Sequence, residues 1–143
     1  MKILVDADAC PVKEIIVEEA KKRNLQVIMI IDTSHELNDG YSEVITVDKA
    51  KDSVDIKLIN ILSKEDIVVT QDFGVAAMTL GKGARAINQN GLIYTDSNID
   101  TLLFERFVGQ KLRRAGKNTN TAKKRTKECD DKFRENFIKL LDK

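Results

Sequence analysis

Short runs of hydrophobic residues alternate along this chain with longer stretches in which hydrophobic residues recur every three or four positions. The first pattern is typical of buried strands and the second of amphipathic helices. The clearest strand is residues 67–70, because every residue in it is β-branched. The predicted strands cover residues 3–5, 26–31, 43–47, 67–70 and 84–87, and a short apolar run follows at 92–94.

Helical periodicity fills the segments between these strands. The predicted helices cover approximately residues 11–23, 52–63, 75–80, 96–112 and 128–141. Asp96 or Ser97 is expected to cap the fourth helix, and the expected apolar face of that helix comprises Ile99, Leu102, Leu103, Phe107 and Val108. The last helix is expected to bury Phe133, Phe137 and Leu141. Strands that alternate with helices predict an α/β fold with a mostly parallel sheet flanked by helices.

A length of 143 residues suits one domain. Residues 115–121 are the best linker candidate, because small and polar residues replace the helical pattern there. We therefore interpret residues 1–115 as the α/β domain, and residues 116–143 as a basic linker and a C-terminal helix packed on the same domain.

The chain offers no membrane or export signal. The longest apolar runs fall far short of the roughly 20 residues that span a bilayer, and the N-terminus reaches Asp6 too early for a signal peptide. Cys10 and Cys129 lack metal-type spacing, so a reduced cytoplasm is the simplest compartment. The sequence leaves a homo-oligomer open.

The net charge of +1 hides an asymmetry. Residues 109–143 hold 12 of the 24 Lys and Arg but only 5 of the 23 Asp and Glu, so this stretch carries +7 and the preceding 108 residues carry −6. An acidic body with a basic arm suits a protein that binds a cation with one part and an anion with the other. A solubilising helix is the alternative explanation.

Four aspartates are candidate metal ligands. Asp6 and Asp8 follow the first strand, Asp72 follows the fourth, and Asp55 lies in the first turns of a helix. Open parallel sheets bind ligands beyond the carboxyl ends of their strands, so we expect these side chains at one edge. Carboxylates without a matching set of His and Cys suit Mg²⁺ or Mn²⁺.

Structural roles are the alternative for several of these residues. Asp8 could cap the helix that begins near Pro11, and Asp52 could cap its own helix and leave Asp55 merely exposed. His35, the only histidine, lies in a polar loop, where an incidental role is more common than that of a catalytic base. We interpret Cys10 as a buried structural thiol rather than a nucleophile.

Four cations are candidate nucleic-acid contacts, namely Arg106, Arg113, Arg114 and Lys117. Arg106 interrupts an apolar stretch, and it turns either toward the carboxylates or onto the solvated face. The others could line a phosphate backbone. No aromatic residue interleaves the run from Arg113 onward, so base stacking is not indicated there.

The motif Asp6-Ala7-Asp8-Ala9-Cys10-Pro11, followed by Val54-Asp55, Thr70-Gln71-Asp72 and Arg113-Arg114, resembles the bacterial YaiI/YqxD family over nearly the whole chain. The wider resemblance is to PIN and NYN domains, which are metal-dependent RNases on a Rossmann-like sheet.

That wider resemblance implies a PIN-like fold and catalytic roles for Asp6, Asp55 and Asp72, with Asp8 as a further metal ligand. It also implies an RNA substrate and the metal-assisted attack of water on a phosphodiester. The single Asp after Thr70-Gln71 departs from NYN domains that carry a repeated acidic pair. One alternative is therefore a nucleic-acid or nucleoprotein binding protein that keeps the metal site with little or no hydrolysis, and another is hydrolysis of a small phosphoester.

Overall fold

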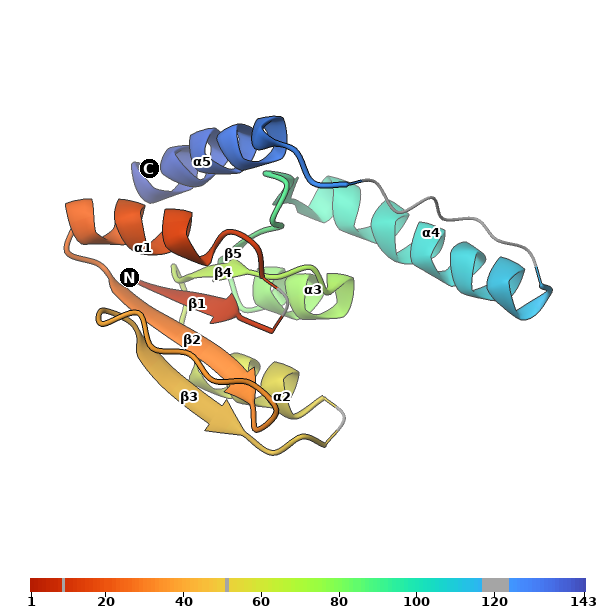
Figure 1. Ribbon diagram of the computed structural model, residues 1–143. Coiled ribbons are helices and arrows are strands. Elements are labelled where there is room, and N and C mark those ends of the chain that lie inside the picture. Colours follow the sequence, from red (N-terminus) through yellow and green to blue (C-terminus); the bar gives the residue numbers. More distant parts are fainter. Residues whose placement is uncertain (9, 51, 117–123) are drawn as a thin grey trace.

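The structure, a computed structural model, describes residues 1–8, 10–50, 52–116 and 124–143. A single six-stranded sheet lies between two layers of helices (Figure 1). The strands are β1 (Lys2–Asp6), β2 (Gln26–Asp32), β3 (Glu43–Val47), β4 (Ile67–Val69), β5 (Arg85–Ile87) and β6 (Ile93–Tyr94). Their order is β3-β2-β1-β4-β5-β6, and only β6 is antiparallel to its neighbour. The predicted α/β fold with a mostly parallel sheet is confirmed.

The helices are α1 (Lys13–Lys22), α2 (Ser53–Ile61), α3 (Phe73–Gly81), α4 (Asp96–Arg114) and α5 (Lys127–Leu141). Alternate side chains of each strand point to opposite faces of the sheet. Ile3 and Val5 of β1 accordingly pack with α1 and α5, whereas Leu4 packs with α2, α3 and the beginning of α4. Two separate hydrophobic clusters result, one on each face.

Helix α5 completes the first of these clusters. Phe133 and Phe137 are fully buried, as the sequence predicted. Their rings stack with centroids 5.1 Å apart. Arg134 pairs with the buried Glu19 of α1, which also accepts a hydrogen bond from Arg23 at 3.1 Å. The C-terminal helix therefore belongs to the core, while the division of the chain at residue 115 stays a prediction.

Helix α4 departs from the expected burial. Ile99 is buried and Leu102 and Leu103 are partly buried, but Phe107 is 53% exposed and Val108 is 37% exposed. The predicted apolar face is therefore wrong in its second half. The physical reason is that this half of α4 extends beyond the end of the sheet, where no strand lies beneath it (Figure 1).

The helix caps also differ from expectation. Thr95, not Asp96 or Ser97, caps α4, in a reciprocal arrangement with Asn98 that satisfies two backbone N–H groups. Helix α1 begins after Val12 without a side-chain cap, so Asp8 does not cap it. Among the described residues, no helix combines the length and the apolar character that a membrane span requires.

Candidate metal and nucleic-acid site

The site lies where the strand order reverses. β1 pairs with β2 on one side and with β4 on the other, so the crevice beyond the carboxyl ends of β1 and β4 is a topological switch point. Asp6 is the last residue of β1, and Asp72 follows β4 by three positions. We call Asp6, Asp8, Asp55 and Asp72 together the acidic rim.

Thr70 links the two strand ends. Its hydroxyl donates a hydrogen bond to Asp6 Oδ2 at 3.2 Å and accepts one from the backbone N–H of Asp72 at 3.0 Å. From the sequence, Thr70 was expected only to end a strand. A hydroxyl residue that ends a β-branched run just before an aspartate was the available signal.

Asp6 is the electrostatic centre of the rim. Burial raises the pKa of its carboxyl to about 6, the hydrogen bond from Thr70 opposes this, and the charges of Asp55, Asp8 and Asp72 raise it further. Burial is also the largest effect that raises the pKa of Asp55. The charges of Asp72 and Asp52 raise this pKa further, and the charge of Arg106 lowers it. These effects indicate that the charges of Asp8, Asp55 and Asp72 lie close enough to Asp6 to disfavour its ionised form.

The alternative role for Asp52 is not supported. Asp52 occupies the N-cap position of α2 with φ +64°, but its side chain makes no capping hydrogen bond. Asp55, in the first turn, is only partly exposed and lines a cavity together with Asp72. Asp55 is therefore turned toward the rim.

Asp72 has a structural contact as well. Its Oδ1 accepts hydrogen bonds from the backbone N–H groups of Gly74 at 2.8 Å and Val75 at 3.1 Å, which caps α3. Arg106 Nη1 lies 3.6 Å from the same oxygen. Arg106 therefore turns toward the carboxylates, although its side chain remains 47% exposed.

Two residues outside the predicted ligand set join Asp8. Nδ1 of His35 lies 3.0 Å from Asp8 Oδ1 and 3.0 Å from Asp32 Oδ1, and it is hydrogen-bonded to Asp32. Hydrogen bonds from the Ser34 hydroxyl, from His35 and from the Ser34 N–H lower the pKa of Asp32 to about 2. Asp32 was not among the candidate ligands from the sequence, although it ends β2, and an incidental role was favoured for His35 because the loop that contains it has no periodicity.

The donors present fit a divalent cation. Asp8 Oδ1 is buried without a hydrogen bond among the described residues, although His35 is near it, so this oxygen is available as a ligand. Asp8, Asp32 and His35 each offer a ligand atom within 4.8 Å of the others. Carboxylates suit hard divalent cations, and imidazole is also a common ligand of divalent metals.

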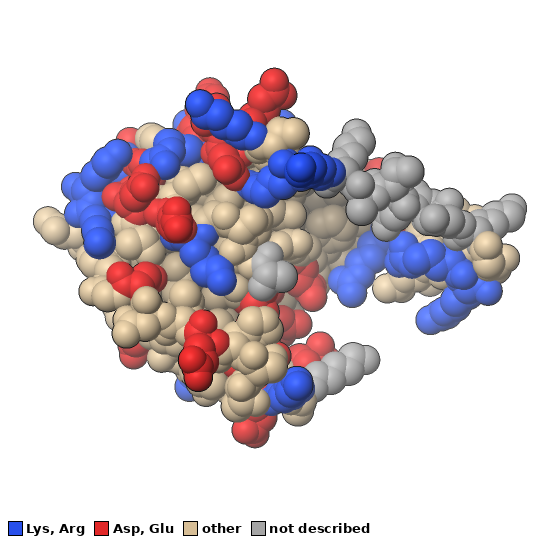
Figure 2. Space-filling model, in the orientation of Figure 1, with Lys and Arg blue, Asp and Glu red and all other residues tan. Residues whose placement is uncertain are grey.

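Basic side chains face the acidic rim from α4. Figure 2 shows Lys and Arg along the arm that α4 forms, and Asp and Glu on the body across from it. Arg113 and Arg114 are exposed on this arm, and Lys117 lies outside the described residues. Arg106 lines three cavities: one with Asp6 and Asp8, one with Asp55, and one with Arg113.

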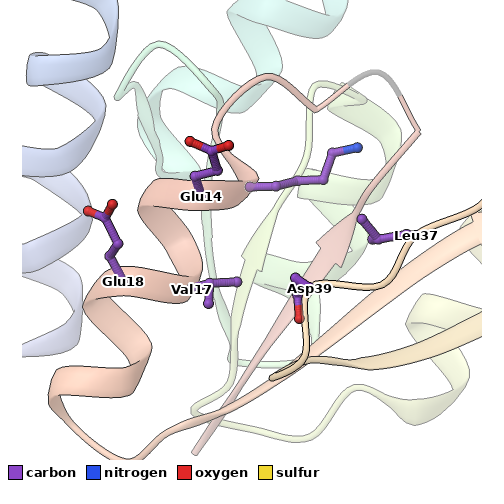
Figure 3. Close-up of a pocket in the computed structure, with 6 residues that line it drawn as sticks. Glu14, Val17, Glu18, Leu37 and Asp39 are labelled. Carbon is purple, nitrogen blue, oxygen red and sulfur yellow. The ribbon is translucent and has the colours of Figure 1, made fainter.

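A further cavity lies away from the rim. It has a volume of about 460 Å³ and separates α1 from the loop after β2, with Val17 and Glu18 on one side and Leu37 and Asp39 on the other (Figure 3). Burial raises the pKa of Asp39, but hydrogen bonds that the backbone N–H groups of Ser42 and Tyr41 donate to its Oδ1 hold the pKa below the ordinary value. None of the rim carboxylates lines this cavity.

The fold and the rim define an α/β protein with a carboxylate-rich edge at its switch point. Residues 4–143 match the family described as "Uncharacterized BCR, YaiI/YqxD family", and the chain belongs to this family. A UPF0178 protein of Ruminiclostridium cellulolyticum is 72% identical over 141 residues, which cover 99% of this chain and 92% of that protein. A UPF0178 protein of Alkaliphilus oremlandii is 56% identical, with the same coverage of both chains.

Among solved structures, the crystal structure of Rae1 (YacP) from Bacillus subtilis, as a W164L mutant, is similar with a TM-score of 0.47 and 16% identity. The match covers 81% of this chain and 84% of that chain. The family model and the two relatives confirm the resemblance to the YaiI/YqxD family, whereas the wider resemblance to PIN and NYN domains stays a prediction.

Proposed function

We propose that this protein is a divalent-metal-dependent nuclease that cleaves RNA phosphodiesters at the acidic rim. The observation that carries the proposal is the gathering of carboxylates around two adjoining cavities, one lined by Asp6, Asp8 and Asp72 and the other by Asp55 and Asp72. The raised pKa of Asp6 agrees with this arrangement. Carboxylates that disfavour one another's charge are stabilised when a cation lies among them. Perturbed pKa values of this kind are typical of functional sites.

Asp6, Asp55 and Asp72 are the proposed catalytic ligands, and Asp8 adds a fourth carboxylate. Asp8, whose Oδ1 lies 3.0 Å from His35 Nδ1, would share its cation with His35 and Asp32. A bound Mg²⁺ or Mn²⁺ supplies the Lewis acidity that activates water and offsets the charge on a phosphodiester. The Thr70 hydroxyl orients the Asp6 carboxylate for this role through its hydrogen bond.

The cations of α4 support a polymeric anion as the substrate. Arg106 is exposed and lies beside Asp72, so it is positioned to bind a phosphate of the RNA next to the phosphate that is cleaved at the acidic rim. Arg113 lines one cavity together with Arg106 and continues the basic surface along α4. Lys117, outside the described residues, would extend that surface. Contacts of this kind position a nucleic acid through its backbone.

The test is to incubate the purified protein with a pool of single-stranded RNA in Mn²⁺, Mg²⁺ or EDTA. We expect cleavage with either metal and none in EDTA. Asp55→Asn keeps the side-chain volume and removes the charge, so it should reduce cleavage by orders of magnitude. Asp131→Asn, at an exposed position on α5, is the matched control and should cleave as the parent does.

RNA binding that requires metal but never produces cleavage would reject the nuclease and favour the nucleic-acid binding protein. Equal cleavage by the parent and Asp55→Asn would point to a contaminating enzyme.

A further inference from the structure

A groove between α2 and α3 begins at the acidic rim and becomes apolar away from it. Its volume is about 480 Å³. Asp55 and Asp72 line the end at which both helices begin, and Ile56, Ile59, Asn60 and Met78 line the remainder. We call this cavity the α2–α3 groove. It adjoins the cavity at Asp6 and Asp8, because Asp72 and Arg106 line both.

Two apolar residues of the groove lie outside the core. Ile56 on α2 is 59% exposed and Met78 on α3 is 48% exposed. A single exposed hydrophobic side chain needs no explanation, but here two helices each contribute one to the same concave surface. Such a surface suits a flat, partly apolar group that enters between them.

One polar side chain accompanies the apolar pair. The Asn60 amide is exposed, and it offers both a hydrogen-bond donor and an acceptor. An amide of this kind can pair with the edge of a nucleobase. From Asp55 to Ile59 the helix rises by one turn, roughly 6 Å, so a nucleotide held by its phosphate at the rim can reach this part of the groove.

We propose that the α2–α3 groove binds the nucleobase of the RNA nucleotide adjacent to the scissile phosphate. Ile56 and Met78 contact the faces of the base, Asn60 hydrogen-bonds its edge, and Arg106 binds the phosphate at the mouth of the groove. This inference rests on the proposed function for the position of the phosphate. It adds a base-binding subsite and assigns Asn60 to base preference.

The test compares ligands that share a phosphate and differ in the base. Ribose 5-phosphate and the four nucleoside 5′-monophosphates are titrated into the Mn²⁺-loaded protein, and binding is followed by calorimetry. We expect at least one nucleotide to bind roughly tenfold more tightly than ribose 5-phosphate, the discrimination that a small hydrophobic pocket provides. Met78→Ala should reduce that advantage severalfold, and Asn60→Ala should narrow the differences among the four bases.

Leu92→Ala, at an exposed leucine remote from the groove, is the control and should bind as the parent does. Thermal unfolding checks that each variant is folded. We expect each one to be folded, because the replaced side chains are exposed. Equal affinities for ribose 5-phosphate and every nucleotide, or unchanged binding in both Met78→Ala and Asn60→Ala, would overturn the inference.

The outcomes separate this inference from the proposed function. RNA cleavage without a base-dependent affinity would leave the nuclease in place and remove the subsite. Base-dependent binding without cleavage would remove the nuclease and keep the subsite. A dimer in sedimentation that Met78→Ala dissociates would identify the groove as a contact between two copies and also reject the subsite.

Discussion

Arg106 Nη1 lies 3.6 Å from Asp72 Oδ1, which brings a cation of the protruding helix α4 to a carboxylate at the end of β4. The two residues are far apart in the sequence, and the pair is partly exposed, so it contributes little to stability. Its significance lies in position, because a phosphate that approaches the rim meets a guanidinium beside the carboxylates.

Arg106→Ala should therefore weaken RNA binding more than it affects the fold. We expect a loss of about 1–3 kcal/mol in binding free energy, the range for a charge-assisted hydrogen bond, and a change in the free energy of unfolding below about 0.5 kcal/mol. Lys64→Ala, at an exposed lysine that precedes β4 at the opposite edge of the sheet, is the control. Equal losses in the two variants, measured by fluorescence anisotropy with labelled RNA, would mean that Arg106 acts only through net charge.

Replacing Arg113 and Arg114 together with alanine should reduce the salt dependence of RNA binding. Each phosphate contact removed lowers the slope of log affinity against log salt by about 0.7 for single strands. The control replaces two exposed lysines away from α4, Lys64 and Lys143, with alanine. It therefore removes the same net charge as the double arginine variant. If both double variants have the same slope, the arm is a solvated surface rather than a binding site.

The pKa of Asp6 predicts a pH dependence for the metal-free protein. The folded value is about 6 and the ordinary value is 3.8, so between them the folded state holds more protons than the unfolded state. The free energy of unfolding should thus fall as pH rises from about 4 to about 6, by on the order of 3 kcal/mol for this group alone.

Asp6→Asn removes this titration. In EDTA we expect it to be more stable than the parent at pH 7.5, with a difference that shrinks toward pH 4. Urea unfolding at several pH values measures it, with Asp131→Asn as the control. A parent and an Asp6→Asn variant whose stabilities change in parallel with pH would contradict the assigned environment of Asp6.

Two phenylalanines test whether α5 is part of the core. Phe137→Ala should destabilise the protein by about 3–5 kcal/mol, because Phe137 is fully buried. Phe107→Ala, on the exposed half of α4, should cost less than about 1 kcal/mol, chiefly through the lost contact with Lys111. Comparable losses in both variants, or a separate unfolding transition in Phe137→Ala, would contradict a single core that includes α5.

The sequence predicted the elements that have strong periodicity. β4 was expected at residues 67–70 and spans Ile67–Val69, and the buried Phe133 and Phe137 of α5 were identified from their spacing. The expectation failed where burial depends on what lies beneath a helix. Phe107 continues the apolar stripe of α4, but the sheet ends before it. The spacing of hydrophobic residues within a helix does not indicate where the neighbouring sheet ends.

The candidate site was predictable to the extent that it follows strand ends. Asp6 and Asp72 were identified because the carboxyl ends of parallel strands lie at one edge of a sheet. The sequence left two directions open for the Arg106 side chain, and only the structure distinguishes them. Asp32 ends β2 beside β1, so the same rule could have identified it, whereas His35 was missed because an irregular loop brings it to Asp8. Thr70 was read only as the end of a β-branched run, although its position two residues before Asp72 was a signal for the hydrogen bond that it donates to Asp6.

The most direct test of the account is whether the acidic rim binds a divalent cation. Titration of the metal-free protein with Mn²⁺, followed by the electron paramagnetic resonance signal of the free ion, measures this without any substrate. We predict saturable binding in the parent and in Asp131→Asn, and a large loss of affinity in both Asp6→Asn and Asp55→Asn. Asp72→Asn should behave like these two variants while it keeps the α3 cap, because asparagine is also a good cap residue. No saturable binding at millimolar Mn²⁺, or equal binding in the parent and the rim variants, would contradict the account.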